Sequence, residues 1–210
     1  ETERWMHAPP PPEPVPSRPL APSQSGVDPV VVSPLDGDAH NRFQRGQLIH
    51  RLLQMLPDLP ADRRAAAAGR YLDLAVHDLD ADARRAIAAE VMAVMEDPAF
   101  APLFGPDSRA EAPITGIIDG PQGPETVSGQ VDRLVVHENK IIVIDYKTNR
   151  PPPARQPDVA EAYLRQMAAY RAVLRQIWPD RQVRCVLLWT DGPRTMSLDD
   201  TRLDRFFDAS

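Results

Sequence analysis

An acid and an amine stand at the end of an apolar run in the stretch IIVIDYKT, residues 141–148. Residues 141–144 are β-branched without a break, which is typical of a strand buried on both faces. Successive side chains of a strand point to opposite faces, so Asp145 and Lys147 share one face. The pattern predicts a carboxylate and an ammonium group together where a central strand reaches the surface.

A second acid, Asp132, lies in the preceding predicted strand, within SGQVDRL. The segment HENK, residues 137–140, predicts a hairpin turn, and pairing about this turn sets Asp132 opposite or near Asp145. Two adjacent carboxylates repel each other, but a divalent cation stabilises them, and oxygen ligands favour Mg²⁺, for which Mn²⁺ can substitute. Lys147 could then hold an attacking water or a phosphate oxygen. Only two of the 24 basic residues are lysines, Lys140 and Lys147, which favours a specific role for Lys147.

Three further sets of polar residues could complete such a site. Gly46 and His50 are four residues apart in GQLIH, so they share one helix face, where glycine lets another segment come close. Gln166 and Tyr170 have the same spacing in QMAAY, and an amide and a phenol one turn apart can hold phosphates or bases. Glu111, at the start of the first predicted strand, is a candidate additional acid.

Each of these residues also has a simpler structural explanation. Asp145 and Lys147 could form an exposed salt bridge, which contributes little to stability. His50 alone is typical of a surface histidine or a capped core histidine. Tyr170 could belong to an apolar helix stripe with Tyr163, Met167 and Leu174. Several arginines lie near the proposed site in the sequence and could contact phosphates, but an exposed helix face would explain them equally well. They are Arg150, Arg155, Arg165, Arg171 and Arg175.

Helices come first along the chain, and strands follow. Apolar spacings of three and four residues predict helices at 42–56, 61–77 and 81–96. After Pro106 the pattern predicts strands at 110–118, 126–137 and 140–147, a helix at 158–177, a strand at 183–189, a short TMSL segment and a last helix from about 200. The expected fold is α/β, with a central mixed β-sheet flanked by helices and an N-terminal helical region.

Composition and charge limit the possible domain organisation and the class of protein. Ten of the 24 prolines lie in residues 1–36, so we expect residues 1–40 to be a linker or arm and residues 41–210 to form one domain. The single cysteine, Cys185, cannot make an internal disulfide and favours a reducing, cytoplasmic setting. No apolar run approaches the ~18 residues of a membrane span, and no signal-peptide pattern opens the chain. The net charge of −6 does not by itself indicate a nucleic-acid-binding protein.

Taken in order, GxxxH, GxxDRL, an apolar run into DYKT, and QxxxY resemble the motifs of RecB- and AddA-type nuclease domains. These domains belong to the PD-(D/E)XK, or restriction-endonuclease-like, superfamily. The likeness covers about residues 42–208 and is greatest to the C-terminal domain of a bacterial AddA helicase-nuclease. It implies a metal site formed by His50, Asp132, Asp145 and the backbone carbonyl of Tyr146, with Lys147 as the catalytic amine. It also implies DNA contacts from Gln166 and Tyr170, to which Arg150 is a candidate addition.

The resemblance further implies a Mg²⁺-dependent deoxyribonuclease, an exonuclease module of a helicase-nuclease that processes double-strand breaks for recombinational repair. Its partners would be DNA, as a single strand delivered by a helicase motor, the rest of an AddA-type chain and an AddB-type subunit, in the bacterial cytoplasm at the nucleoid and away from membranes. The iron–sulfur cysteines of some relatives are absent, so no cluster is expected, and no GxxxxGK[ST] motor motif occurs. Two alternatives stay open: a catalytically degenerate fold that binds nucleic acid or scaffolds a partner, and a free-standing nuclease acting on RNA or branched DNA.

Overall fold

A computed structural model describes residues 39–120 and 123–207 of the chain. The proline-rich segment predicted as an arm therefore lies almost entirely outside the described residues. Within the described part, five strands form one mixed sheet in the order β1-β2-β3-β4-β5, and helices cover both of its faces. The predicted fold class, a mixed sheet flanked by helices after an N-terminal helical region, is confirmed.

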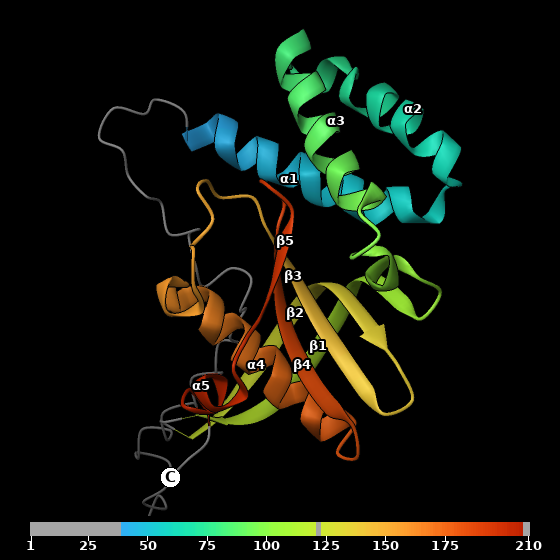
Figure 1. Cartoon of the computed structure of the whole chain (residues 1–210). Coiled ribbons are helices and arrows are strands. Elements are labelled where there is room, and N and C mark those ends of the chain that lie inside the picture. The colour runs from blue at the N-terminus through green and yellow to red at the C-terminus, as the bar shows by residue number, and fades with distance from the viewer. Residues whose placement is uncertain (1–38, 121–122, 208–210) are drawn as a thin grey trace, which may run out of the picture.

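The N-terminal helical region consists of α1 (Ala39–Met55), α2 (Ala61–Leu72) and α3 (Ala81–Glu96). The start of α3 is capped by Asp80, whose side chain accepts a hydrogen bond from the Ala83 N–H. The helix predicted over 61–77 is too long, because Leu74 adopts an extended conformation and only a 3₁₀ turn, Ala75–His77, follows. In Figure 1 the three helices gather together, separate from the C-terminal helices.

The strands are β1 (Ser108–Gly120), β2 (Gly123–Val136), β3 (Lys140–Lys147), β4 (Gln182–Trp189) and β5 (Arg194–Ser197). All neighbouring pairs are antiparallel except β3 and β4, which are parallel. A parallel pair needs a crossover, and α4 (Glu161–Ile177) provides it. This helix begins at Glu161 and not at 158, since residues Gln156–Asp158 form a separate 3₁₀ turn. A short helix, α5 (Asp200–Asp204), is the last helix of the described chain.

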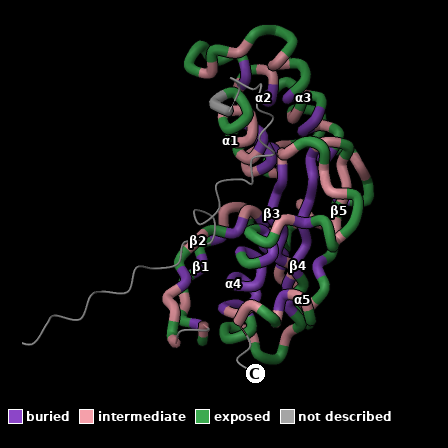
Figure 2. The backbone as a smooth tube through the Cα atoms, turned by 90° about the vertical axis from the view of Figure 1, so that its left-hand side faces the viewer, coloured by how far each residue is buried: buried purple, intermediate pink, exposed green. Residues whose placement is uncertain are grey.

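The strand β3 separates two hydrophobic cores, as its unbroken apolar run predicts. Ile141 and Val143 pack in the core beneath α4 and α5. Ile144 and Tyr146 pack in the core formed with α1, α2 and α3. Buried residues follow β3 and β4 through the middle of the molecule (Figure 2). The C-terminal end of β3 is therefore enclosed on both faces, which is where Asp145 and Lys147 lie.

None of the helices within residues 39–120 and 123–207 is long and apolar enough to cross a membrane.

Candidate active site

The hairpin of β2 and β3 brings the two aspartates to the same end of the sheet. The ladder between these strands runs from Val136 opposite Ile141 to Arg133 opposite Ile144. One position further, Asp132 and Asp145 follow the last pair. Beyond the last backbone pair, the Asp132 side chain takes the place of a backbone partner. Its Oδ2 accepts a hydrogen bond of 2.7 Å from the Tyr146 N–H.

The strand β2 departs from regular alternation at Asp132. Val131 packs on the α4 side of the sheet, whereas Arg133, two residues later, donates to the Tyr146 hydroxyl and to the Leu53 carbonyl on the opposite side. In a regular strand these two side chains would share a face. The neighbouring strand is also irregular here, since Glu111 has a φ of 51°. This irregularity turns the Asp132 side chain toward both the Tyr146 N–H and α1.

Asp132 forms an ion pair with His50 of α1. The two atoms, His50 Nδ1 and Asp132 Oδ1, are 3.4 Å apart, and the imidazole meets the Tyr146 ring edge-on at 5.6 Å between centroids. Burial alone would lower the pKa of His50, but the charge and hydrogen bond of Asp132, helped by Asp145, raise it to about 9. Burial likewise opposes ionisation of Asp132, and His50 outweighs it, so the pKa of that carboxyl is lowered.

Asp145 and Lys147 form a second, more deeply buried ion pair. Asp145 Oδ2 lies 2.6 Å from Lys147 Nζ, and Asp145 Oδ1 accepts a hydrogen bond of 2.8 Å from Gln166 Nε2. The same amide closes a ring, because its Oε1 accepts a hydrogen bond of 3.3 Å from Lys147 Nζ. Burial raises the pKa of Asp145, the Lys147 ammonium opposes this, and the nearby Asp132 charge adds to it.

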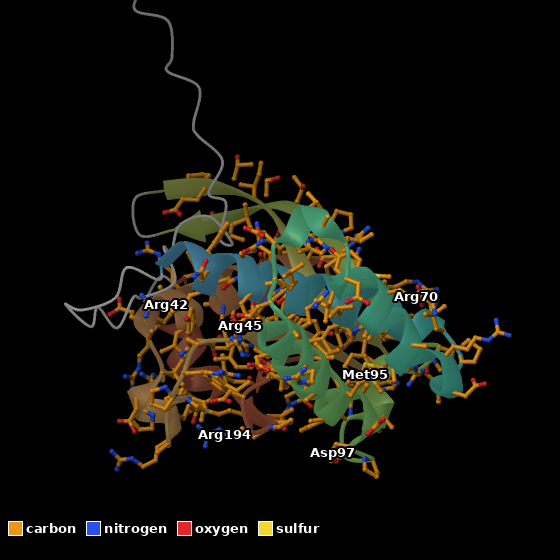
Figure 3. The ribbon with its side chains drawn as sticks, turned by 90° about the horizontal axis from the view of Figure 1, so that it is seen from above. Arg42, Arg45, Arg70, Met95, Asp97 and Arg194 are labelled. Atoms are coloured by element: carbon orange, nitrogen blue, oxygen red, sulfur yellow. The ribbon has the colours of Figure 1, made fainter. Side chains whose placement is uncertain are left out.

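Gly46 lets α1 approach the end of β3. A Cβ atom at this position would lie 3.0 Å from Thr148 Oγ1, tighter than ordinary van der Waals contact. Arg45, beside Gly46, donates a hydrogen bond of 3.1 Å to the Thr148 carbonyl. In Figure 3 the Arg45 label lies beside the blue ribbon of α1. The close approach brings the helix that carries His50 against the strand that carries Asp145.

Glu90 of α3, which sequence reasoning missed, connects these elements. Its buried carboxylate accepts hydrogen bonds from Arg45 and Arg150 and one of 2.5 Å from the Thr190 hydroxyl, just after β4. Glu90 and Thr190 are 100 residues apart in the sequence, and an acid on an alanine-rich helix gives no local signal of such a contact.

Arg133 is a second missed residue. It is buried, donates to the Tyr146 hydroxyl at 2.8 Å, the Ser108 hydroxyl at 2.8 Å and the Leu53 carbonyl at 2.9 Å, and its guanidinium lies 4.8 Å from the Phe104 ring centroid. The sequence signal that could have indicated its role is its place directly after Asp132 in GxxDRL. The hydrogen bond to Tyr146 fixes the residue whose N–H holds Asp132.

The other predicted residues lie around this centre in different ways. Gln166 is buried and hydrogen-bonds to both Asp145 and Lys147. Tyr170 is fully buried and its hydroxyl donates a hydrogen bond of 2.9 Å to the Gln130 carbonyl, so it belongs to the apolar stripe of α4. A contact between Tyr170 and DNA stays a prediction. Arg150 pairs with Glu90 and, at 3.2 Å, with Asp191, and about half of its side chain is exposed. Glu111 is near enough that the Asp132 charge, after burial, raises its pKa.

The chemistry of these residues fits a divalent cation. Asp145 Oδ2 is buried and receives no hydrogen bond of acceptable geometry from a described residue, although the Lys147 ammonium lies close to it. Carboxylate oxygens, an imidazole and a backbone carbonyl are ligands that Mg²⁺ or Mn²⁺ accept. Among the residues the structure describes, no three acidic, histidine or cysteine side chains already converge on one point. His50 and Lys147 are instead paired with the two aspartates that would bind the ion.

A mixed sheet with two acids on an antiparallel hairpin and a lysine two residues beyond the second acid defines a restriction-endonuclease-like nuclease fold. The family model of the PD-(D/E)XK nuclease superfamily matches residues 26–204, so the chain belongs to this superfamily.

Solved structures of other proteins are similar to the chain, among them the following two. One, a "putative exonuclease" of Eubacterium rectale, is 12% identical with a TM-score of 0.50; the match covers 77% of this chain and 61% of that protein. The other, SSO0001, is 17% identical with a TM-score of 0.35, and the match covers 79% of this chain and 82% of that one. Because the Eubacterium rectale protein is only 12% identical, the likeness to it shows a shared fold and nothing more. A search of curated proteins finds no match.

Proposed function

We propose that this chain is the nuclease domain of an AddA-type helicase-nuclease and hydrolyses phosphodiester bonds of single-stranded DNA with Mg²⁺. The observation that carries the proposal is the hairpin that places Asp132 beside Tyr146 and Asp145, with Lys147 Nζ 2.6 Å from Asp145 Oδ2. The ordered motifs and the superfamily membership support the same conclusion. The helicase motor, the AddB-type subunit and the role in recombinational repair are part of the proposal.

The metal would be held by Asp132, Asp145, His50 and the Tyr146 carbonyl. When bound, Mg²⁺ supplies positive charge to the scissile phosphate and lowers the pKa of an attacking water. Gln166 orients the other groups, since it donates to Asp145 and accepts from Lys147. The Lys147 ammonium stabilises the negative charge that develops on the phosphate oxygens.

Arg150 would contact a neighbouring phosphate. Glu90 and Asp191 hold its guanidinium from the protein side, while 49% of the side chain remains exposed. A guanidinium has five donors, so the outer ones can bind a phosphate without releasing the inner ones. The overall charge of −6 supports delivery of the strand by a motor, because the chain alone should capture DNA weakly.

The purified chain is tested with end-labelled single-stranded DNA, duplex DNA and RNA of one sequence, with Mg²⁺, Mn²⁺ or EDTA. We expect slow, metal-dependent cleavage of single-stranded DNA that Asp132→Asn and Asp145→Asn each abolish. Glu138→Gln, in the exposed turn, is the matched control and should cleave like wild type.

The other outcomes separate the alternatives. Absence of both cleavage and Mn²⁺ binding by calorimetry overturns the nuclease proposal in favour of a degenerate fold. Faster cleavage of RNA supports a free-standing nuclease. Cleavage of DNA at the rate of an autonomous nuclease contradicts delivery by a motor.

A further inference from the structure

The Lys147 ammonium lies in an enclosure with three sides. Asp145 Oδ2 is 2.6 Å away, Gln166 Oε1 is 3.3 Å away, and the third side is the ring of Tyr163, whose centroid is 3.8 Å from Nζ. Lys147 and Tyr163 are both buried, with 8% and 5% of their surface exposed. Tyr163 lies in the first turn of α4, one turn before Gln166.

We propose that Tyr163 is a positioning residue for Lys147. This inference rests on the proposed function, in which Lys147 stabilises charge on the scissile phosphate. The face of an aromatic ring attracts an ammonium group, and the attraction is stronger where water is excluded. The ring accepts no conventional hydrogen bond from the ammonium. It therefore holds Lys147 in place without using an N–H group, so that one of the three remains for a phosphate oxygen beside those directed at Asp145 and Gln166.

The orientation of the ring is itself supported from both sides. Its hydroxyl reaches Asn149 Oδ1 at 3.5 Å, just after β3, and the rest of the side chain packs in the core beneath α4. Lys147 and Asn149 flank Thr148, so one aromatic side chain contacts two residues of the segment that leaves β3. Sequence reasoning placed Tyr163 only in the apolar stripe of α4, because the approach of Lys147 depends on how α4 packs across the sheet.

The scarcity of lysine permits a direct test that needs no nuclease activity. Protein labelled with ¹³C at the lysine ε-carbon gives two signals, from Lys140 and Lys147. A ring 3.8 Å from Nζ should shift the Lys147 ε-protons upfield by its ring current. We expect this shift in the metal-free wild type and in Tyr163→Phe, and its loss in Tyr163→Leu, with the Lys140 signal unchanged as the internal control.

Cleavage kinetics then show whether the contact matters for the reaction. Tyr163→Leu should lower kcat by about 10- to 30-fold, the size of a desolvated cation–π contact, while KM changes by less than about twofold. Tyr163→Phe, the conservative variant, should keep most of the rate. The inference is overturned if the Lys147 signal of a folded Tyr163→Leu protein stays at its wild-type upfield position, or if that protein keeps wild-type kcat.

If Tyr163→Leu does not fold, fluorinated phenylalanines at position 163 replace it. They keep the size of the ring and weaken its attraction for a cation, so kcat should fall with each added fluorine; a flat series overturns the inference. If the wild-type chain cleaves no substrate, the proposed function fails separately, and the presence or absence of the Lys147 ring-current shift alone decides the contact with Tyr163.

Discussion

The His50–Asp132 ion pair makes the stability of the metal-free protein depend on pH in a defined direction. The pKa of His50 is about 9 in the folded protein, against an ordinary value of 6.5 when unfolded. A group whose pKa is raised by folding stabilises the protein fully below the unfolded value and loses that stabilisation as the pH rises through the folded value. We therefore expect the free energy of unfolding to fall between about pH 6.5 and pH 9.

Asp132→Asn should reverse the sign of this effect. Without the Asp132 charge, burial is the main influence left on His50, so its pKa should drop below 6.5 and the variant should lose stability toward acid pH. The rise from 6.5 to about 9 corresponds to a net contribution of about 3 kcal/mol from His50, after burial has opposed the ion pair. Because 32% of the His50 side chain is exposed, solvent screening reduces the expected loss to about 1–2 kcal/mol at pH 6.

Urea unfolding in EDTA at a series of pH values measures the stability, and NMR titration of the histidine ring protons measures the pKa. Asp107→Asn is the matched control, since Asp107 pairs with His137 at 3.7 Å but is 63% exposed, and its effect should stay below about 0.5 kcal/mol. The reasoning is refuted if wild type and Asp132→Asn give parallel stability curves from pH 6 to pH 10, or if the His50 pKa is near 6.5 in both.

Three further changes test the supporting residues. Arg133→Met should cost about 3 kcal/mol in urea unfolding, because the Tyr146 hydroxyl and a backbone carbonyl lose their buried partner; a loss below 1 kcal/mol would contradict its structural role. Lys147→Ala should lower kcat by an amount that corresponds to roughly 2–4 kcal/mol of transition-state stabilisation, and wild-type cleavage would remove Lys147 from the mechanism. Glu90→Ala should destabilise the chain by about 2–4 kcal/mol, measured by thermal and urea unfolding, since it leaves the buried Thr190 hydroxyl and the guanidinium groups of Arg45 and Arg150 without their carboxylate; an unchanged midpoint would show that Arg45 and Arg150 pair elsewhere.

Local patterns were sufficient to predict the elements that carry the acids. The β-branched run of β3 and the turn before it predict a central strand and a hairpin, and both are present. The spacing of Asp132 and Asp145 about that turn then follows from strand geometry alone. Helix α3 was predicted with its observed bounds, because its apolar repeat is unbroken over 81–96 and Pro98 follows it.

The contacts that orient the acids could not be predicted in the same way. The left-handed conformation of Glu111 belongs to an irregularity shared by two strands, which no single strand pattern reveals. Glu90 reaches Arg45 and Thr190 only after α3 has packed over the sheet ends. Tyr163 meets Lys147 because α4 crosses the sheet at one particular place. Each contact depends on tertiary packing between elements far apart in the chain, on which residue type and spacing carry no information.

The two aspartates illustrate how a fold can keep like charges close together without a metal. Each acid has its own cation: His50 pairs with Asp132, and Lys147 pairs with Asp145. Removing one member of a buried ion pair leaves an uncompensated charge, so the cations stabilise the acids that the reaction requires. The same pairing means that a metal must displace the proton of His50, which can then bind the ion together with Asp132, and must compete with Lys147 for Asp145. Metal affinity in this chain therefore depends on how much more strongly the carboxylates bind the metal than they bind the protonated His50 and Lys147. Weakening either ion pair should change that affinity as directly as changing a ligand.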